Sequence, residues 1–464
     1  MAPTHSAPRR RLEDLTCLHP NAAGFDIGSE QIVVAVPPDR DEQPVRVFRT
    51  FTPDLHALVA WLQACEIDTV AMESTGVFWV PIYELLEQAG ITPYLVNARH
   101  IKTVPGRKSD WNNAQWRHPL HALGLLRGSF RPDAEMVTLR TLARYRTELI
   151  ERRAPHINHL QQALKQMNIQ LNVVLSDITG VTGLAILRAI VAGERDPARL
   201  AELRNPGCKA SVAEISKALT GNWQQAHLFI LQQALEIFDY YTNKIAVCDA
   251  ELERQYQSME SRGERNAALP DLPPAKPGSK SKNEPNFNVR AQMARILGVD
   301  LVAVMRLSAS SVQTIISEIG TDMSKFPSVK HFCSWVGLAP RNDVSGGKVL
   351  RSRTMKVRSR ANQAFRDAAA SVGRSDSALG AYYRAMRARL GPQQAIVATA
   401  HKIARIVYHL LTTHEPYREE SGAQYEQRRR ERELVQLRRR AQKLGFMLAP
   451  VPTPAPETQP EPGS

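Results

Sequence analysis

Several features are scarce in this sequence of 464 residues, and each scarcity excludes a class of protein. It has no apolar run of about 18 residues, so we expect no transmembrane helix. The first residues include arginines but no apolar core, so we expect no signal peptide. The five cysteines lie far apart and form no Cys-x-x-Cys pair, which argues against a zinc site and a disulfide framework. We therefore expect a cytoplasmic protein with reduced thiols.

Positive charge, in contrast, is in excess. The chain has 60 Lys and Arg against 46 Asp and Glu, a formal net charge of +14, while aromatic residues make up 6%. The hydrophobic fraction of 43% allows packed cores, which excludes a wholly disordered chain and a low-complexity fibre. Because the basic residues cluster, nucleic acid is the expected partner. At roughly 100–200 residues per domain, the length predicts two to four domains.

Residues 21–132 have the pattern of a mixed α/β domain. Three β-branched runs separated by short turns predict an antiparallel meander, and two further strands alternate with helices. This order of elements predicts an RNase H-like (RuvC-like) domain. We predict strands at 22–27, 31–36, 45–51, 69–72 and 94–96, and helices at 52–65, 82–88 and 112–126.

The remainder of the chain is predicted to be mostly helical. Apolar residues three and four positions apart, from Leu228 to Leu252, predict either a coiled-coil hairpin or dimer seam or an ordinary amphipathic helix in a bundle. The leucines spaced along residues 139–167 are the candidate partner of this stripe. The predicted organisation is a flexible N-terminus (1–20), a RuvC-like domain (21–132), a helical, coiled-coil region (133–260), a flexible linker (261–288), a mostly helical C-terminal domain with a serine (289–417), an arginine-rich helix (418–448) and a disordered, proline-rich tail (449–464).

Acidic residues fall where an RNase H-like fold carries its metal ligands. Asp26 lies on the first strand, Glu73 at the end of the fourth, and Asp110 at the start of the last helix. Clustered carboxylates can hold two Mg²⁺ ions about 3.5–4 Å apart for phosphoryl transfer. Asn113 follows on the same helical face as Asp110, and its neutral amide oxygen would bind a second metal more weakly. Each position alone also suits a turn or cap residue.

A second candidate site is the turn Ser345-Gly346-Gly347-Lys348. Residues 341–366 carry eight cationic residues and one acidic residue, a density typical of phosphate contact. The serine is either a nucleophile towards a phosphodiester, activated by a base, a metal or the surrounding guanidiniums, or a plain turn residue. The predicted nucleic-acid contacts are Arg341, Lys348, Arg351, Arg353, Lys356, Arg358 and Arg360, together with Arg428, Arg429 and Arg430, which also suit a solvated helix face.

Several motifs together resemble one protein family. They are GFDIGS around Asp26, MESTGVFW around Glu73, GRKSDWNNAQW around Asp110, then SDITGVTGLAILRAIVAGERDP, SEIGTDMSKFP, SWVGLAP and SGGKVLRSRT. In this combination the chain resembles the DEDD-type insertion-sequence transposases, the "IS one-ten" family in its "eleven-eleven" branch. The resemblance extends from about residue 20 to residue 448. The best-understood relatives are RNA-guided DNA recombinases.

The resemblance implies a RuvC-like domain that holds Mg²⁺ through Asp26, Glu73, Asp110 and the position of Asn113. It also implies a C-terminal transposase domain in which Ser345 forms a transient phosphoserine link to DNA. An element-encoded guide RNA would pair with donor and target DNA. The protein would be a homo-oligomer, a dimer or a tetramer, without a membrane partner and associated with the bacterial nucleoid.

Two departures from the family pattern are visible. Asn113 stands where the fourth carboxylate is expected, which predicts impaired chemistry. Met305-Arg306-Leu307-Ser308 lacks the glycine expected before SEIG. Two alternatives therefore stay open: a RuvC-like nuclease or junction resolvase that uses water, and a non-catalytic nucleic-acid-binding protein.

Overall fold

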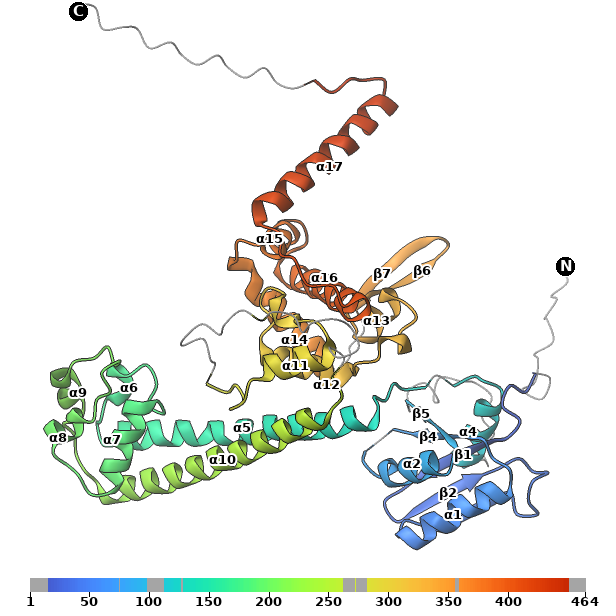
Figure 1. Cartoon of the computed structure of the whole chain (residues 1–464), viewed down its shortest axis with the longest axis horizontal. Coiled ribbons are helices and arrows are strands. Elements are labelled where there is room, and N and C mark those ends of the chain that lie inside the picture. The colour runs from blue at the N-terminus through green and yellow to red at the C-terminus, as the bar shows by residue number, and fades with distance from the viewer. Residues whose placement is uncertain are drawn as a thin grey trace, which may run out of the picture. The chain divides into compact units, whose positions relative to one another are not determined.

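The computed structural model describes residues 16–74, 76–97, 112–126, 128–261, 272, 282–354 and 359–449 (Figure 1). Asp110, Lys356 and Arg358 lie outside the described residues, as does the side chain of Arg341. Most of the predicted N-terminal stretch, linker and tail also lies outside them. The chain divides into two compact units, Met1–Arg131 and Pro132–Ser464.

The first unit is built on a five-stranded mixed sheet with the strand order β3-β2-β1-β4-β5. The first three strands form an antiparallel meander, while β4 and β5 run parallel to β1. This topology is consistent with the predicted RNase H-like fold. The strands are β1 (Ala22–Ile27), β2 (Gln31–Ala35), β3 (Val45–Arg49), β4 (Thr69–Glu73) and β5 (Thr92–Val96).

Helices cover both faces of this sheet. Helices α1 (Thr52–Ala64) and α2 (Trp79–Gln88) pack on one face, in a core that includes Phe25 and Met72. Helix α4 (Asn113–Ala122) packs on the other face. Because successive strand residues point to opposite faces, the neighbours of Phe25 and Met72 in sequence point towards α4.

A glycine in β1 allows α4 to lie directly on the strand. A Cβ atom at Gly24 would come within 2.4 Å of both the Ala114 carbonyl oxygen and the His118 amide nitrogen. Protein interiors have no room for such an overlap, so any other residue would push α4 away from the sheet. Gly24 thereby sets the distance between α4 and the end of β1, where Asp26 stands.

The described start of the chain is held against the end of α4. The backbone N–H groups of Leu18 and His19 both donate to the carbonyl oxygen of Ala122, at 2.8 and 2.9 Å. His19 also stacks on His121, with ring centroids 5.1 Å apart. Residues 16–20, which the sequence places in a flexible N-terminus, are therefore anchored to the first unit.

The second unit begins with two long helices, α5 (Ala134–Gln166) and α10 (Gln225–Ser258), that lie side by side (Figure 1). They are antiparallel, since Arg146 binds Asp249 whereas Arg153, later on α5, binds the earlier Thr242. Most of the heptad-spaced residues of α10 are buried in this pair or in the small core beside it. The apolar stripe therefore packs within the chain, and a supercoiled dimer seam stays a prediction.

The end of the predicted linker packs on these two helices. Arg146 donates to the backbone carbonyl of Asn283 at 2.9 Å, and Arg153 donates to the Asn283 side chain at 2.9 Å. The backbone N–H of Asn286 donates to Asp249 at 3.0 Å. The buried Arg146–Asp249 pair thus has additional hydrogen-bond partners, which a buried ion pair requires. Residues 283–286 are consequently a fixed part of the unit.

The other described elements of the second unit are helices shorter than these two and one hairpin. Beside one end of the long helices lie α6 (Leu171–Val174), α7 (Val181–Val191), α8 (Pro197–Glu202) and α9 (Val212–Ala218). Further along are α11 (Val289–Leu297), α12 (Ala309–Ile319), α13 (Val329–Trp335), β6 (Pro340–Ser345), β7 (Lys348–Thr354), α14 (Arg360–Ser371), α15 (Ala378–Leu390), α16 (Pro392–Thr413) and α17 (Gly422–Lys443), with 3₁₀ turns at Leu301–Ala303, Met323–Lys325 and Val372–Arg374.

The five cysteines are free thiols, as expected from their spacing. Within the described ranges, no helix combines the length and the apolar character needed to cross a bilayer.

Candidate functional site

The structure brings Asp26 and Glu73 together. Strands β1 and β4 are parallel neighbours, so their carboxyl ends meet at the same edge of the sheet. Both side chains point to the face covered by α4, and both are partly exposed. Two of the predicted metal ligands are therefore neighbours, whereas the third, Asp110, lies outside the described residues.

The guanidinium of Arg117 lies between these two carboxylates. Its Nη1 donates to Asp26 Oδ1 at 2.8 Å and to the Phe25 carbonyl oxygen at 2.6 Å, and its Nη2 donates to Glu73 Oε2 at 2.5 Å. Arg117 is only 3% exposed. No pattern in the sequence had pointed to Arg117. The signal that could have found it is its position four residues after Asn113, which places both on one face of α4.

Asn113 contacts the same carboxylate from the first turn of α4. The helix begins here because the Asn112 side chain accepts from the Gln115 backbone and the Gln115 side chain accepts in return. Asn113 Nδ2 then donates to Asp26 Oδ2 at 3.0 Å. An ionised carboxylate only accepts hydrogen bonds, so the amide presents its NH₂ group to Asp26 and not its oxygen. Both oxygens of Asp26 are thus occupied by donors from α4.

This arrangement does not fit the magnesium centre that the resemblance implies. Mg²⁺ requires oxygen ligands in near-octahedral geometry. Here the facing oxygens of Asp26 and Glu73 accept N–H groups from Arg117, whose side chain remains a cation in proteins. Asn113 turns a donor towards Asp26. Among the residues that the structure describes, no group of three or more His, Cys, Asp or Glu side chains could hold a metal ion.

Ser345 lies at the tip of the hairpin formed by β6 and β7, in the second unit. The loop residues Gly346 and Gly347 have φ of +55° and +75°. Two positive φ angles define the tight type I′ turn, which favours glycine. Ser345 and Lys348 close the hairpin opposite each other, and both side chains are exposed. The turn predicted from the sequence is therefore present, and it displays the serine hydroxyl to solvent.

The described cationic and apolar side chains of the hairpin are exposed. Arg351 lies opposite Asp343, and Arg353 lies opposite the backbone position of Arg341. Val344, Val349 and Leu350 are largely exposed. A two-stranded hairpin is marginally stable in water, and apolar groups exposed on it are typical of a surface that a partner covers.

The segment that lacks the expected glycine contains a left-handed residue. Arg306, in Met305-Arg306-Leu307-Ser308, adopts φ of +68°, a region that glycine occupies without strain. The backbone turn is therefore made here by an exposed arginine. This arginine offers a cationic side chain where a glycine would offer only backbone.

The predicted arginine-rich segment forms α17, a helix with a single buried residue, Gly422. It carries eight cationic residues and three acidic ones. Arg429 and Arg430 are exposed, and Arg428 pairs with Glu420. Arg360 is likewise exposed, at the first residue of α14. The helix buries too little surface to explain its own stability, since even Leu434, Val435 and Leu437 are exposed. Its excess of cationic residues favours a polyanionic partner.

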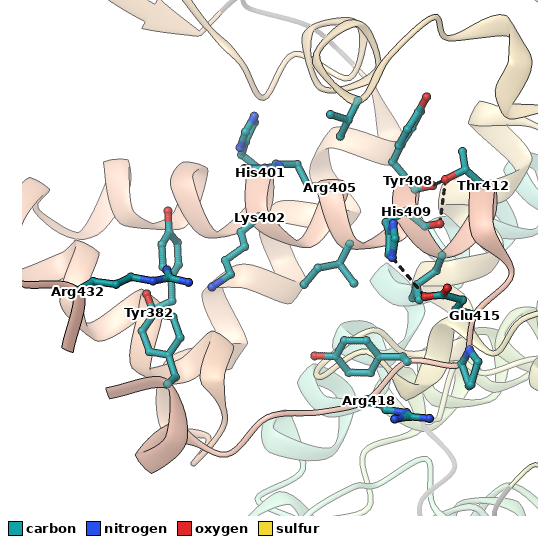
Figure 2. Close-up of a pocket in the computed structure, with 16 residues that line it drawn as sticks. Tyr382, His401, Lys402, Arg405, Tyr408, His409, Thr412, Glu415, Arg418 and Arg432 are labelled. Carbon is teal, nitrogen blue, oxygen red and sulfur yellow. Dashed lines mark hydrogen bonds and ion pairs between the residues drawn. The ribbon is translucent and has the colours of Figure 1, made fainter. Parts of the chain in front are cut away.

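A cationic pocket of about 1210 Å³ lies between α16 and the segment that leads to α17 (Figure 2). At one end of it, Lys402 Nζ lies 4.4 Å from the ring centre of Tyr382 and 4.5 Å from that of Tyr425. Burial lowers the pKa of Lys402 to about 8, and the nearby guanidiniums add to this effect. The other ionisable residues that line the pocket are His401, Arg405, His409, Glu415, Arg418 and Arg432. At this pocket the sequence singled out the arginines of α17 and the stretch from His401 to Arg405, as a helix edge that faces DNA, but not the two tyrosines beside Lys402.

Two parts of the chain match known protein families. Residues 23–169 match the DEDD model of the IS110 type, described as "Transposase", and residues 301–384 match the "Transposase IS116/IS110/IS902 family". Both matches are to IS110-family transposases. The first transposase match contains the Asp26–Arg117–Glu73 cluster, and the second contains the Ser345 hairpin. No curated protein matches the chain.

The transposase matches support the function that the sequence motifs imply. They indicate an enzyme that recombines DNA and is encoded by an insertion sequence. Neither match extends to α16 or α17, so the Lys402 pocket lies almost entirely outside the matched ranges.

Proposed function

We propose that this protein is an insertion-sequence transposase that cuts and rejoins DNA through Ser345. The observation that carries the proposal is the exposed serine hydroxyl at the tip of a cationic hairpin. The match of that segment to a transposase model supports it. A serine whose only role was to end a strand would not need a surround of guanidiniums.

In the proposed step, Ser345 Oγ attacks a phosphorus atom of the DNA backbone. A P–Oγ bond forms, a P–O bond to deoxyribose breaks, the released sugar oxygen takes a proton, and the serine proton passes to a base or to water. Lys348, Arg351 and Arg353 stabilise the charge on the five-coordinate phosphorus. Attack by a hydroxyl of another strand on the phosphoserine link then rejoins the DNA and regenerates the serine.

The cationic surfaces of the second unit would hold the nucleic acid. Helix α17 offers a row of arginines, and Lys402 between two tyrosines offers a single protected cation for a phosphate. We propose that DNA and an element-encoded guide RNA share these surfaces, because both present the same phosphate backbone. The exposed apolar side chains Val344 and Leu350 suit a second copy of the chain, in a dimer or tetramer.

The family's Mg²⁺ dependence is expected to be weakened in this chain. Asn113 supplies an amide where a carboxylate is needed, and Arg117 occupies two of the carboxylates. We therefore propose tight nucleic-acid binding with reduced strand exchange.

A covalent-adduct assay tests the proposal. The full chain is expressed with the flanking DNA of its element, so that any guide RNA is made, and is mixed with labelled junction DNA and Mg²⁺. After denaturation, protein carrying DNA is measured for three proteins: the chain itself, Asn113→Asp/Arg117→Met, and the same double variant with Ser345→Ala. We expect the adduct to be strongest in the double variant and absent from the triple variant. Adduct that persists without Ser345 contradicts the proposal.

Two other functions make different predictions in the same assay. A RuvC-like nuclease would release cut DNA without an adduct, but it depends on the carboxylates that Arg117 occupies. A non-catalytic nucleic-acid-binding protein would bind without cutting in all three cases. Because a RuvC-like nuclease needs these carboxylates, the Arg117 contacts favour the binding protein over the nuclease as the alternative to the proposal.

A further inference from the structure

We infer that Arg117 acts as a built-in cation that takes the place of a metal ion between Asp26 and Glu73. The inference goes beyond the proposed function, because it concerns how the first unit neutralises its carboxylates, whatever Ser345 does. It rests on the convergence of both carboxylates on one buried guanidinium.

The surroundings of Arg117 hold it in this position. Trp116 and Leu120, beside it on α4, are fully buried in the core under the sheet. The close contact of α4 with Gly24 leaves the helix no room to tilt inwards. The Phe25 carbonyl gives the guanidinium a third acceptor. Arg117 is therefore fixed by its helix as well as by its ion pairs.

Displacing Arg117 would be costly. Its Nε atom is already buried with no acceptor among the described residues. A divalent ion on Asp26 and Glu73 would take both carboxylate acceptors of Arg117, and would leave its buried charge with only the Phe25 carbonyl oxygen as an acceptor and without an opposite charge. Uncompensated buried charge is among the most destabilising features that a folded protein can contain. The resident guanidinium therefore excludes the metal more strongly than the missing carboxylate at Asn113 does.

The two explanations for weak metal binding can be separated. If Asn113 alone is responsible, Asn113→Asp restores binding of a divalent ion. If Arg117 is responsible, Asn113→Asp has little effect and Arg117→Met is required, because methionine fills similar space without a charge or a donor. Arg131 offers a matched control, since it is also an arginine of the first unit with a mostly buried side chain, and it pairs with Glu84 and Glu87.

The experiment uses Mn²⁺ as the probe, with binding to the full chain followed by electron paramagnetic resonance and thermal unfolding recorded with Mn²⁺ or with EDTA. We expect no Mn²⁺-dependent shift in Tm for the unmodified chain, Asn113→Asp or Arg131→Met. We expect Arg117→Met to have a lower Tm in EDTA that Mn²⁺ raises. Asn113→Asp/Arg117→Met should bind Mn²⁺ at least about tenfold more tightly than Asn113→Asp.

Two results would overturn the inference. One is a Mn²⁺-dependent rise in the Tm of the unmodified chain or of Asn113→Asp. The other is a folded Arg117→Met chain, alone or with Asn113→Asp, that gains no Mn²⁺ response. The first result does not depend on whether the Arg117 variants fold. Neither measurement involves DNA or Ser345, so a failure of this inference can be told apart from a failure of the proposed function.

Discussion

Arg117 Nη1 lies 2.8 Å from Asp26 Oδ1, although the two residues are 91 positions apart in the chain. The contact joins strand β1, which carries Asp26, to helix α4, which carries Arg117. Through Nη2 it also reaches Glu73 on the adjacent strand. The Arg117 side chain therefore connects β1, β4 and α4 at the edge of the sheet where the resemblance implies metal ligands.

The first prediction concerns the stability of this cluster. Arg117→Met should lower the free energy of unfolding in EDTA by about 2 kcal/mol, below the 3–5 kcal/mol typical of a fully buried pair because both carboxylates are partly exposed. Adding Asp26→Asn and Glu73→Gln should recover much of the loss, since the repelling charges are then gone. Urea unfolding measures both values. A triple variant less stable than Arg117→Met would mean that the loss is not electrostatic.

The second prediction concerns acid. His121 is buried, and its Nε2 lies 2.9 Å from Thr69 Oγ1. Burial, with the charges of His19 and His118, lowers the pKa of His121 to about 4. As pH falls from about 6.5 to about 4, the unfolded chain gains a proton that the folded chain does not. The free energy of unfolding should therefore fall over that window, by up to about 3 kcal/mol from this residue.

Urea unfolding at pH 7.5, 6 and 5 measures this loss. His121→Gln keeps a donor for Thr69 and cannot take up the proton, so its stability should depend less on pH. His56→Gln, at an exposed position of α1, is the control and should retain the full dependence. An unchanged pH profile in His121→Gln would assign the acid loss to other groups.

Local patterns predicted the first unit well. All five strands lie within a few residues of their predicted positions, because alternation of apolar residues is a local property of the chain. Asp26 and Glu73 were found for the same reason, as acidic residues at strand ends. The heptad pattern of α10 predicted an apolar stripe, and the leucines spaced along residues 139–167 were correctly expected to be its partner, since most of them lie on α5.

The residues that were missed depend on long-range packing. In the sequence, Arg117 looks like any other basic residue of an amphipathic helix. Its contacts with the carboxylates exist only because α4 packs directly on Gly24. The low pKa of Lys402 likewise depends on its burial and on the guanidiniums of Arg428 and Arg432, which α17 brings close to it. In both cases the chemistry arises from a contact between elements, which residue spacing along one element does not encode.

The third prediction concerns the turn that displays Ser345. Gly346 has φ of +55°, which a β-branched residue adopts only at a cost of about 1–2 kcal/mol. Gly346→Val should therefore open the hairpin, whereas Gly346→Asn should preserve it, since Asn-Gly is a favoured type I′ pair. The rate of tryptic cleavage after Lys348 reports the difference. Equal rates in the two variants would show that the turn geometry does not hold the hairpin together.

The last prediction concerns the Lys402 pocket. Lys402 is mostly charged at pH 7 and mostly neutral at pH 9, because its pKa is about 8. If it binds a phosphate, affinity for a single-stranded oligonucleotide should fall over this range. Lys402→Arg should remove the pH dependence and keep the affinity, because arginine stays charged. Lys402→Ala should weaken binding at pH 7 and reduce the salt slope by about 0.7, the value of one contact on a single strand.

Fluorescence anisotropy at fixed salt, with labelled DNA and RNA in parallel, measures each of these effects. Lys217→Ala is the matched control, because this lysine is exposed on α9 and does not line the pocket. Equal losses with both nucleic acids would mean that the pocket recognises the shared phosphate, and a loss with only one would assign the pocket to that partner. Lys402→Ala and Lys217→Ala chains with the same affinity and salt slope would show that the cation between Tyr382 and Tyr425 serves packing and not binding.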